Sequence, residues 1–433
     1  MPCRDTGVGL NLGAVSVIKC DLTVSRPAMN ASVPSSLLAA VEMAPKDPIL
    51  GVTEAFNADT NPRKINLGVG IYCDDEGKVP LLECVKDVQR GLVAKGSPLP
   101  YLPIDGIAAY DKAVQQLVFG VDSNVIQEGR AVTVQGLGGT GSLKIGADFL
   151  RRFLPSAQVW ISDPSWENHR ALFEGAGFKV NTYPYYDETT HGVDFEGMTA
   201  ALAAAPEGSV IVLHACCHNP TGADMTDEQW SRVIEIVRAR GQIPFLDLAY
   251  QGFADGIAAD GAIVGRFAAT PGPLFVATSF SKSFSLYGER IGALSVVAAS
   301  RDEAARLLSQ IKRVVRANYS NPPTNGAQMV ATVLTTPELR SKWERELEGM
   351  RVRILANRRA LVDALSKRMP QRDFSFVLKQ RGMFSYSGLS ADQVARLRTE
   401  YSVYAISTGR ICVAALNSRN IEYVADSIAK VLA

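Results

Sequence analysis

One lysine stands in a setting that could do covalent chemistry. The segment ATSFSKSFSLYGERIG, residues 277–292, places Lys282 in a serine-rich turn after an apolar run. A lone lysine usually lies on the surface, because lysines are seldom buried without a partner. Here, however, Ser279 and Ser281 offer hydroxyl groups, and Arg290 offers a planar guanidinium that matches the oxygens of a phosphate group. The segment therefore predicts either an exposed lysine or an amine that forms a Schiff base next to a bound phosphate.

A carboxylate near the end of another apolar run is a second candidate. The segment IPFLDLAYQGF, residues 243–253, carries Asp247 and, three residues later, Tyr250. A carboxylate in such a place must be paired, solvated or functional. If a pyridine ring lies over the sheet, Asp247 could keep its nitrogen protonated and make the ring an electron sink, and Tyr250 could bind the ring oxygen. The segment by itself is equally compatible with two residues that tie a loop.

A glycine-rich segment suggests a phosphate site and also a rival function. QGLGGTGSLK, residues 135–144, follows an apolar run and opens a helical pattern, so its backbone N–H groups could bind a phosphate at the helix N-terminus. Gly136, Gly138 and Gly141 also form a GxGxxG pattern, and Asp163 follows at about the distance that holds a ribose. The rival is therefore an NAD-dependent oxidoreductase, which leaves the lysine, aspartate and arginine above unexplained.

The segment VLHACCHNPTG resembles a metal site at first sight. His214, Cys216 and His218 alternate and would share one face of a strand. Small and thiol side chains also pack inside sheets, and the chain has neither a CxxC pair nor an HExxH helix, so we expect no metal. Asn219 precedes Pro220, which holds it extended, so its amide could point at a ligand.

Four further side chains have both a structural and a functional interpretation. Trp166 in SDPSWENH is either a core residue or a flat face for an aromatic cofactor. His169 is either a loop histidine or a group that orients Asp247. Arg316 and Arg410 do not stand on obvious solvent faces, and Arg410 after a glycine could bind the α-carboxylate of an amino acid.

The bulk composition limits the class of partner. The chain has 433 residues, more than one hydrophobic core usually serves, so we expect two domains. Its 45 Lys and Arg residues nearly balance 44 Asp and Glu residues, so no strong field would attract nucleic acid or an anionic membrane. The seven cysteines, with Cys216 and Cys217 adjacent, are typical of a reducing compartment. We therefore expect a cytoplasmic protein with small-molecule partners.

The pattern of apolar runs predicts an α/β fold. Runs at residues 131–135, 210–217 and 273–279 are each followed by a turn and a helical pattern, which indicates a mostly parallel sheet sandwiched by helices. Ligands bind such a sheet at the carboxyl ends of its strands.

A second, smaller α+β domain is expected at the C-terminus. One long helix over 342–369 would lead into it, followed by strands over 373–380 and 382–388, a helix over 391–401, a strand over 409–416 and a terminal helix. The first forty or so residues contain no membrane-spanning or signal segment and are expected to be an irregular, disordered leader. The predicted division is a leader at 1–42, an arm with part of the small domain at 43–78, a large domain at 79–348 and a small domain at 349–433.

Ten segments in order carry a family resemblance. From about Pro48 to the C-terminus the chain resembles the class I aminotransferases, in the subgroup of the aspartate and aromatic amino acid enzymes and closest to the aromatic ones. The resemblance implies the fold-type I transferase fold, pyridoxal 5′-phosphate as cofactor and a homodimer with shared active sites. The segments are NLGVGIY, YLPIDG, GGTGSLK, SDPSWENH, HACCHNPTG, DLAYQGF, SFSKSFSLYGERIG, RANYSNPP, RGMFSYSGL and STGR.

The resemblance also implies roles for individual residues. Lys282 would carry the cofactor and move the substrate's α proton, with Asp247 and Tyr250 as further catalytic residues. The other cofactor-binding residues would be Gly139, Thr140, Trp166, His169, Asn219, Ser279, Ser281 and Arg290, with Tyr101 from the neighbouring subunit. The substrate would contact Val69, Gly70, Trp166, Asn219 and Arg410, with Arg316 from the neighbour meeting a dicarboxylate's distal group.

The predicted reaction is transamination. We expect an amino group to move from Tyr, Phe and also aspartate to 2-oxoglutarate. The alternatives are a strict aspartate aminotransferase, the NAD-dependent oxidoreductase described above, and a cofactor-binding interaction protein without turnover.

Overall fold

The computed structural model describes residues 36, 38–44 and 50–433. The chain divides into two units, residues 1–45 and 46–433. In the first unit, Ser36 and residues 38–44 form an exposed turn in which the Ala39 N–H donates to the Ser36 carbonyl at 3.1 Å. Most of the expected leader lies outside the described residues.

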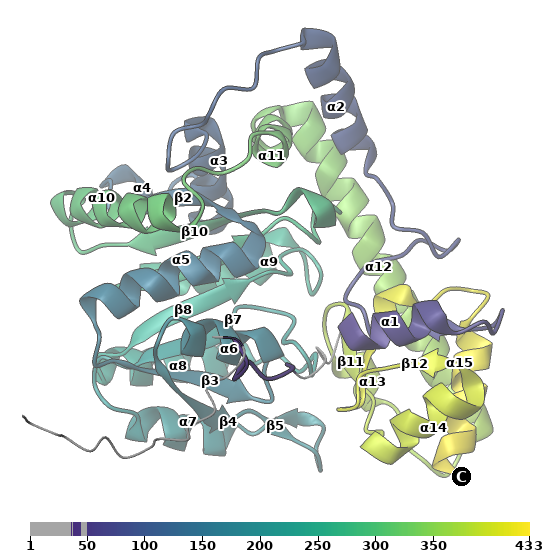
Figure 1. Ribbon diagram of the computed structural model, residues 1–433. Helices are drawn as coiled ribbons and strands as arrows, with labels where there is room; N and C mark the ends of the chain where they lie inside the picture. Colours follow the sequence, from purple (N-terminus) through teal and green to yellow (C-terminus); the bar gives the residue numbers. More distant parts are fainter. Residues whose placement is uncertain (1–35, 37, 45–49) are drawn as a thin grey trace, which may run out of the picture. The chain divides into compact units, whose positions relative to one another are not determined.

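The second unit contains a seven-stranded sheet with the order β2-β10-β9-β8-β7-β3-β4 (Figure 1). β10 is antiparallel to both of its neighbours, whereas all other pairs are parallel. The predicted mostly parallel sheet is therefore confirmed. Its strands are β2 (Ala131–Leu137), β3 (Gln158–Asp163), β4 (Lys179–Pro184), β7 (Val210–His214), β8 (Ile243–Leu248), β9 (Leu274–Ser279) and β10 (Ile291–Val297).

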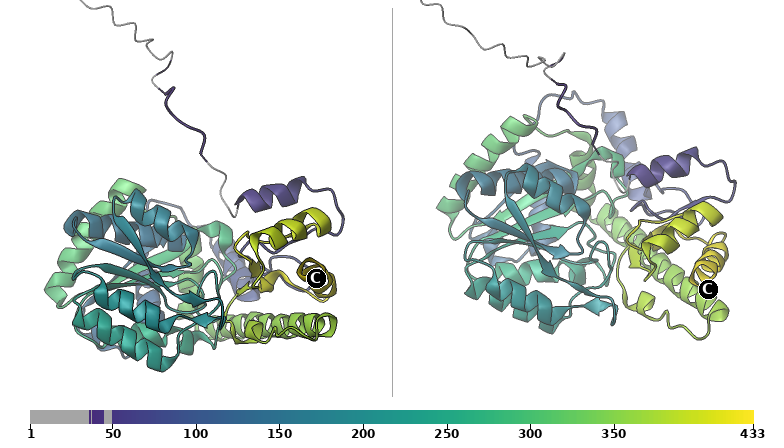
Figure 2. Two further views of the ribbon diagram at one scale, coloured as in Figure 1. Left: turned by 90° about the horizontal axis from the view of Figure 1, so that it is seen from below. Right: turned by 60° about the horizontal axis from the view of Figure 1, so that its bottom comes forward.

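Helices cover both faces of the sheet (Figure 2). Because both faces are covered, successive residues of a central strand are buried on opposite sides: Phe245 packs in one core and Leu246 in the other. One layer contains α5 (Gly138–Phe153), α6 (Glu167–Gly175) and α10 (Arg301–Asn318). The other contains α3 (Ala108–Phe119), α7 (Phe195–Ala204), α8 (Asp227–Ala239), α9 (Ile257–Ala268) and α11 (Asn325–Thr335). The chain before residue 337 also contains α2 (Glu83–Lys95), α4 (Asn124–Gln127), η1 (Tyr287–Glu289) and the hairpin β5 (Tyr186–Asp187) and β6 (Gly192–Val193).

A long helix connects the sheet to the C-terminal elements (Figure 1). α12 (Pro337–Arg368) contacts α2 and α11 near one end and α13 and α15 near the other. It begins five residues before the predicted position 342, because Pro337 suits the first turn of a helix. The C-terminal elements are α13 (Phe376–Lys379), β11 (Phe384–Tyr386), α14 (Ala391–Tyr401), β12 (Val403–Tyr404), β13 (Arg410–Cys412), η2 (Val413–Ala415) and α15 (Ile421–Leu432).

The start of the second unit is joined to these C-terminal elements. α1 (Leu50–Ala58) precedes β1 (Ile65–Asn66), which pairs in parallel with β12. The Leu67 carbonyl accepts the Cys412 N–H at 2.8 Å. Two stretches far apart in the sequence therefore form one layer.

Two predicted strands differ in the structure. Residues 373–380 contain the short helix α13 (Phe376–Lys379) instead of a strand, because the Asp373 carboxylate accepts the Ser375 N–H at 2.8 Å and turns the chain. The predicted strand over 409–416 ends at Cys412 and continues as a 3-10 turn. The predicted helix over 391–401 is confirmed as α14. No helix among the described residues is both long and apolar enough to cross a bilayer.

Candidate active site

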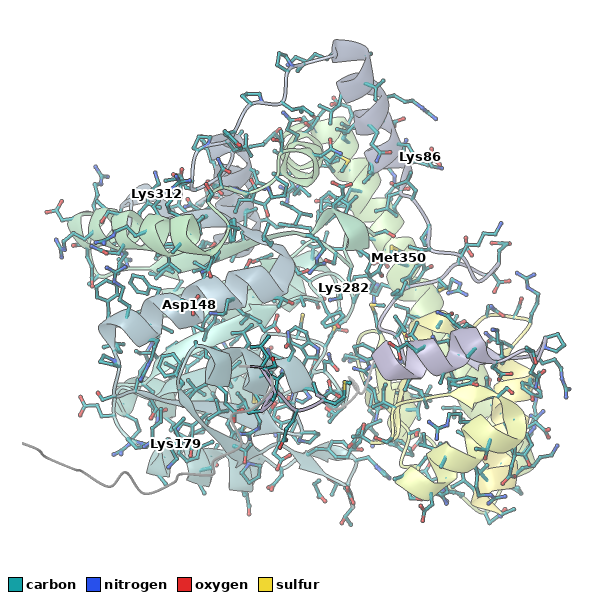
Figure 3. All side chains as sticks on the ribbon, viewed as in Figure 1. Lys86, Asp148, Lys179, Lys282, Lys312 and Met350 are labelled. Carbon is teal, nitrogen blue, oxygen red and sulfur yellow. The ribbon has the colours of Figure 1, made fainter. Side chains whose placement is uncertain are left out.

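A cavity of about 210 Å³ lies at the carboxyl ends of β7, β8 and β9, where these strands face the C-terminal elements. Lys282 lies at this end of the sheet (Figure 3). The cavity is lined by Gly70, Gly139, Thr140, Leu143, Trp166, His214, Asn219, Asp247, Ala249, Tyr250, Ser279, Ser281, Lys282, Tyr287, Arg290, Phe384 and Arg410.

Lys282 occupies the turn that follows β9. Its Nζ lies 4.9 Å from the centroid of the Tyr250 ring. Burial lowers the pKa of this amine from its usual value of 10.5, the nearby charge of Arg290 adds to the effect, and Asp247 opposes it. A larger fraction of neutral amine is therefore present near neutral pH than for a surface lysine, and a neutral amine can act as nucleophile or base.

Asp247, at the end of β8, is held by a chain of hydrogen bonds. His169 Nε2 lies 3.0 Å from Asp247 Oδ2, and His169 Nδ1 lies 3.0 Å from Ser165 Oγ. Burial by itself would raise the pKa of Asp247, but the hydrogen bond from His169 and the positive charge of Lys282 outweigh it, so the pKa lies below its usual value. An ionised carboxylate only accepts, so His169 Nε2 carries the proton of this bond.

The three residues that suggested a metal site do not form one. β7 ends at His214, and the chain turns at Cys217, where φ is 52°. His218 uses both ring nitrogens on hydroxyls, at 2.9 Å from Ser162 Oγ and 2.8 Å from Thr221 Oγ1. Burial lowers the pKa of His214 to about 3, so its ring is neutral at neutral pH.

The start of α5 forms a cradle for an anion. Gly138 has a φ of +70°, and a Cβ there would lie 2.7 Å from the guanidinium of Arg290. A Cβ at Gly139 would lie 3.2 Å from Ser279 Cβ. Arg290 Nη1 donates to Ser281 Oγ at 3.3 Å. Because these glycines lack side chains, free N–H groups of the helix start, two hydroxyls and one guanidinium converge, which suits a phosphate.

The same glycines do not fit a dinucleotide site. In such a site the ribose-binding carboxylate ends the strand next to the glycine-rich strand. Here β2 pairs with the antiparallel β10, whereas Asp163 is exposed at the end of β3, with β10, β9, β8 and β7 in between. The GxGxxG pattern thus serves a different anion.

Arg410 forms the opposite wall of the cavity. Its side chain is buried, with Nη1 donating to Asn219 Oδ1 at 3.0 Å and Nη2 donating to the Gly68 carbonyl at 2.7 Å. The Phe384 ring lies 4.4 Å from its Cζ, and Nε has no hydrogen-bond partner. A buried guanidinium with an unused donor is suited to a substrate carboxylate.

Four of the predicted site residues do not line this cavity, and one of them, His169, lies behind Asp247 and contacts its carboxylate. Val69 is next to Gly70, which does line it. Tyr101 is 92% exposed, and Arg316 is exposed and donates to Ser320 Oγ. Tyr101 and Arg316 are the two residues that the resemblance assigns to a neighbour's site.

Comparison with known proteins decides the family. Residues 62–428 match the family described as aminotransferase class I and II. This chain belongs to that family. It is 59% identical to an aspartate aminotransferase of Pseudomonas aeruginosa, over 92% of this chain and all of the relative. It is 51% identical to an aromatic-amino-acid aminotransferase of Escherichia coli, over 89% of this chain and 98% of the relative.

A solved structure gives the same result for the fold. The aromatic-amino-acid aminotransferase from Burkholderia pseudomallei, covalently bound to pyridoxal phosphate, matches with a TM-score of 0.90 at 62% identity, covering 92% of this chain and 100% of that one. The fold-type I prediction is thereby confirmed.

Sequence reasoning overlooked some residues of this aminotransferase's cavity. Tyr287 lines it, and its hydroxyl accepts the Tyr72 N–H at 2.9 Å, which links the Gly70 segment to the turn after Lys282. The proximity of Tyr287 to Lys282 in sequence was the available signal. Phe384 had none, because its position over Arg410 depends on the pairing of β11 with β13.

Proposed function

We propose that this aminotransferase uses pyridoxal 5′-phosphate to move an amino group from aromatic amino acids and aspartate to 2-oxoglutarate. The observation that carries the proposal is the convergence of Lys282, Asp247 and Arg410 on one cavity. An amine with a lowered pKa, a buried ionised carboxylate and a buried guanidinium are what amino-group transfer from an amino acid requires.

The donor set around Lys282 fits this cofactor. The anion cradle at Gly138 and Gly139 suits its phosphate, and the carboxylate of Asp247 suits a protonated pyridine nitrogen. The Trp166 ring offers a flat face, and Tyr250 and Asn219 offer donors for the ring oxygen. Pyridoxal phosphate supplies an aldehyde that condenses with amines and a ring that withdraws electrons from the substrate's α carbon.

Each residue then has a defined task. Lys282 Nζ would hold the cofactor covalently and, once released, would take the proton from the substrate's α carbon. Its lowered pKa favours the neutral amine, which is the form that can take a proton. Asp247 keeps the ring nitrogen protonated, and His169 fixes the carboxylate by its 3.0 Å hydrogen bond. Arg410 binds the α-carboxylate and so orients the α proton toward Lys282.

The proposal extends to the assembly. We infer a cytoplasmic homodimer in which Tyr101 and Arg316 complete the neighbour's site, since both are exposed and lie outside this chain's own cavity. Val69 and Gly70 belong to the segment that closes over substrate. The chain would comprise a leader at 1–42, an arm with part of the small domain at 43–78, a large domain at 79–348 and a small domain at 349–433.

A strict aspartate aminotransferase is the second candidate, and the 59% identity to the Pseudomonas aeruginosa aspartate aminotransferase favours it. A panel of amino donors against 2-oxoglutarate separates the two. Turnover of tyrosine and phenylalanine at rates comparable to aspartate supports the broader activity. Turnover of aspartate alone supports the narrower one.

The decisive experiment is chemical. Purified protein is expected to be yellow and to shift its absorbance when an amino donor is added without acceptor. Borohydride reduction followed by peptide mapping is expected to place the pyridoxyl label on Lys282. A label on another lysine, such as Lys144 in the same region of the fold, or no label, contradicts the mechanism.

A further inference from the structure

A second cavity lies behind the active-site wall. It has a volume of about 430 Å³, and His214 lines both cavities. Its charged and thiol lining includes Cys216, Asp224, Asp260 and Arg381. The reaction described above uses none of these four residues.

Three possible metal ligands lie together, and two of them, Cys216 and Asp260, line this cavity. The Sγ atoms of Cys216 and Cys217 and a carboxylate oxygen of Asp260 all lie within 4.8 Å of one another, and all three residues are buried. The Asp224 carboxylate holds the turn that carries Cys217: it accepts the Cys217 N–H at 2.7 Å and the His218 N–H at 2.8 Å. The alternating pattern in the sequence grouped Cys216 with His214 and His218, because it assumed that the strand continues past His214, where the structure has a turn.

Asp260 is fixed from the other side. Its Oδ2 accepts the N–H groups of Gly252 and Ala254 at 2.8 and 2.9 Å, whereas its Oδ1 accepts only that of Asp255, at 2.8 Å. Oδ1 therefore keeps an acceptor site. Both cysteines are free thiols. Two sulfurs and one oxygen at this spacing suit a thiophilic divalent cation and do not suit Mg²⁺ or Ca²⁺, which take oxygen ligands.

We propose that Cys216, Cys217 and Asp260 form a binding site for a thiophilic divalent cation, Zn²⁺ or Cd²⁺, and that occupancy inhibits the enzyme. The cavity leaves room for a water ligand in the fourth position and a path for entry. The cation is an inhibitor and takes no part in the reaction.

Only a few contacts separate the two sulfurs from the active-site residues. Cys217 Sγ lies 3.9 Å from the Tyr250 carbonyl, and the Tyr250 ring faces Lys282. Asn219, two residues after Cys217, accepts from Arg410. A cation that draws the two sulfurs together therefore displaces groups that contact the cofactor and the substrate carboxylate. This inhibitory effect rests on the proposed transamination, whereas the binding itself does not.

Binding is a proton exchange without oxidation. The two thiols lose their protons to solvent as two metal–sulfur bonds form, and the Asp260 carboxylate adds a metal–oxygen bond. The apparent affinity is therefore expected to rise by roughly 100-fold per pH unit, since two protons are released.

The test uses Cd²⁺ on the full-length holoenzyme under a phosphine reductant. Binding is followed by the thiolate-to-cadmium charge-transfer absorbance, and function by the rate of the half-reaction with an amino donor. Cys216→Ser and Cys217→Ser remove the thiols one at a time. Cys84→Ser is the matched control, because Cys84 is a buried free cysteine in α2, away from both cavities.

In the unaltered protein and in Cys84→Ser, one Cd²⁺ per chain is expected to bind and to slow the half-reaction by roughly tenfold or more, because displacements of about 1 Å can cost about 100-fold in rate. A chelator is expected to reverse both effects. Each variant at 216 or 217 is expected to lose the absorbance band and the inhibition. The same band in Cys217→Ser, or inhibition that a chelator does not reverse, overturns the proposal. The absorbance titration tests cation binding whether or not the chain transaminates.

Discussion

One wall of the candidate active site is the carboxyl edge of the seven-stranded sheet, whereas the other is assembled from short elements near both ends of the chain. Asp247 lies near the end of β8 and Lys282 follows β9, and both strands have strand neighbours on both sides. Arg410 stands on a strand of three residues that, within the described part of the chain, pairs with β11 alone, and it is tied to the Gly68 carbonyl.

The difference suggests a division of labour. Groups that must keep a fixed geometry toward the cofactor are placed on the rigid sheet, where backbone hydrogen bonds hold each strand end. The carboxylate-binding group is placed on a layer with few ladder bonds, held by the Arg410 contacts to Asn219 and Gly68. A layer held by so few contacts can move more easily when a substrate arrives.

The largest effect is expected from the sheet wall. Lys282→Ala should still bind pyridoxal phosphate but lower the half-reaction rate by about 10⁴-fold, the upper range for a positioned base. Stopped-flow absorbance measures this rate. Lys144→Ala, which removes an amine paired with Asp148 on α5, is the control and should keep the normal rate. Comparable losses of half-reaction rate in both variants would contradict the role of Lys282 as the positioned base.

Arg410→Gln tests the opposite wall. The change should raise the barrier by about 2–5 kcal/mol, the cost of truncating one partner of a buried charge pair. Because every amino acid carries the α-carboxylate, kcat/KM should fall by a similar factor for aspartate and phenylalanine. A fall in kcat/KM confined to one donor would mean that Arg410 binds the side chain of that donor instead of the α-carboxylate.

Arg316→Leu should discriminate between donors. If Arg316 meets the distal carboxylate from the neighbouring subunit, the activation free energy derived from kcat/KM with aspartate should rise by about 1.5–3 kcal/mol. This is the value of a hydrogen bond to a charged group. Activity with phenylalanine should change little. Steady-state kinetics with both donors provides the ratio, and equal losses would contradict the role.

Tyr287→Phe tests the link between the walls. The change leaves the Tyr72 N–H without its 2.9 Å partner, at a cost of about 1–3 kcal/mol. We expect KM to rise more than kcat falls, because the Gly70 segment loses its anchor. Tyr183→Phe, which removes a 2.7 Å bond to the Val212 carbonyl inside the large core, should lower stability without changing KM.

The smallest effect concerns pH. Only the neutral amine of Lys282 condenses with the aldehyde, so the rate at which the cofactor-free protein regains its yellow colour should rise with pH and level off at the lysine's pKa. Burial places this plateau below pH 10.5. Asp247 raises the pKa of Lys282, so Asp247→Asn should move the plateau to still lower pH. A plateau that moves upward would contradict this coupling.

Local patterns in the sequence predicted much of the sheet wall. The runs ending at Ser279, Leu248 and His214 are apolar on both faces, so they had to be buried parallel strands, and their ends had to share one edge. The sequence thereby indicated the carboxyl edge of the sheet as the place for a ligand, whereas the shared role of Lys282 and Asp247 at one cofactor was implied by the family resemblance. The error at residues 373–380 arose because an aspartate turn overrode an apolar pattern that suits either a strand or a buried helix.

By itself, the sequence determined which side chains follow each buried strand, because a strand buried on both faces appears in the sequence as a nearly continuous apolar run. Tertiary structure alone decided which distant segments meet. The Arg410 contact to Gly68, the position of Phe384 over Arg410 and the grouping of Cys216 with Asp260 join residues 26 to 342 positions apart. Such contacts depend on how whole layers pack, and no local pattern of residue types encodes that packing.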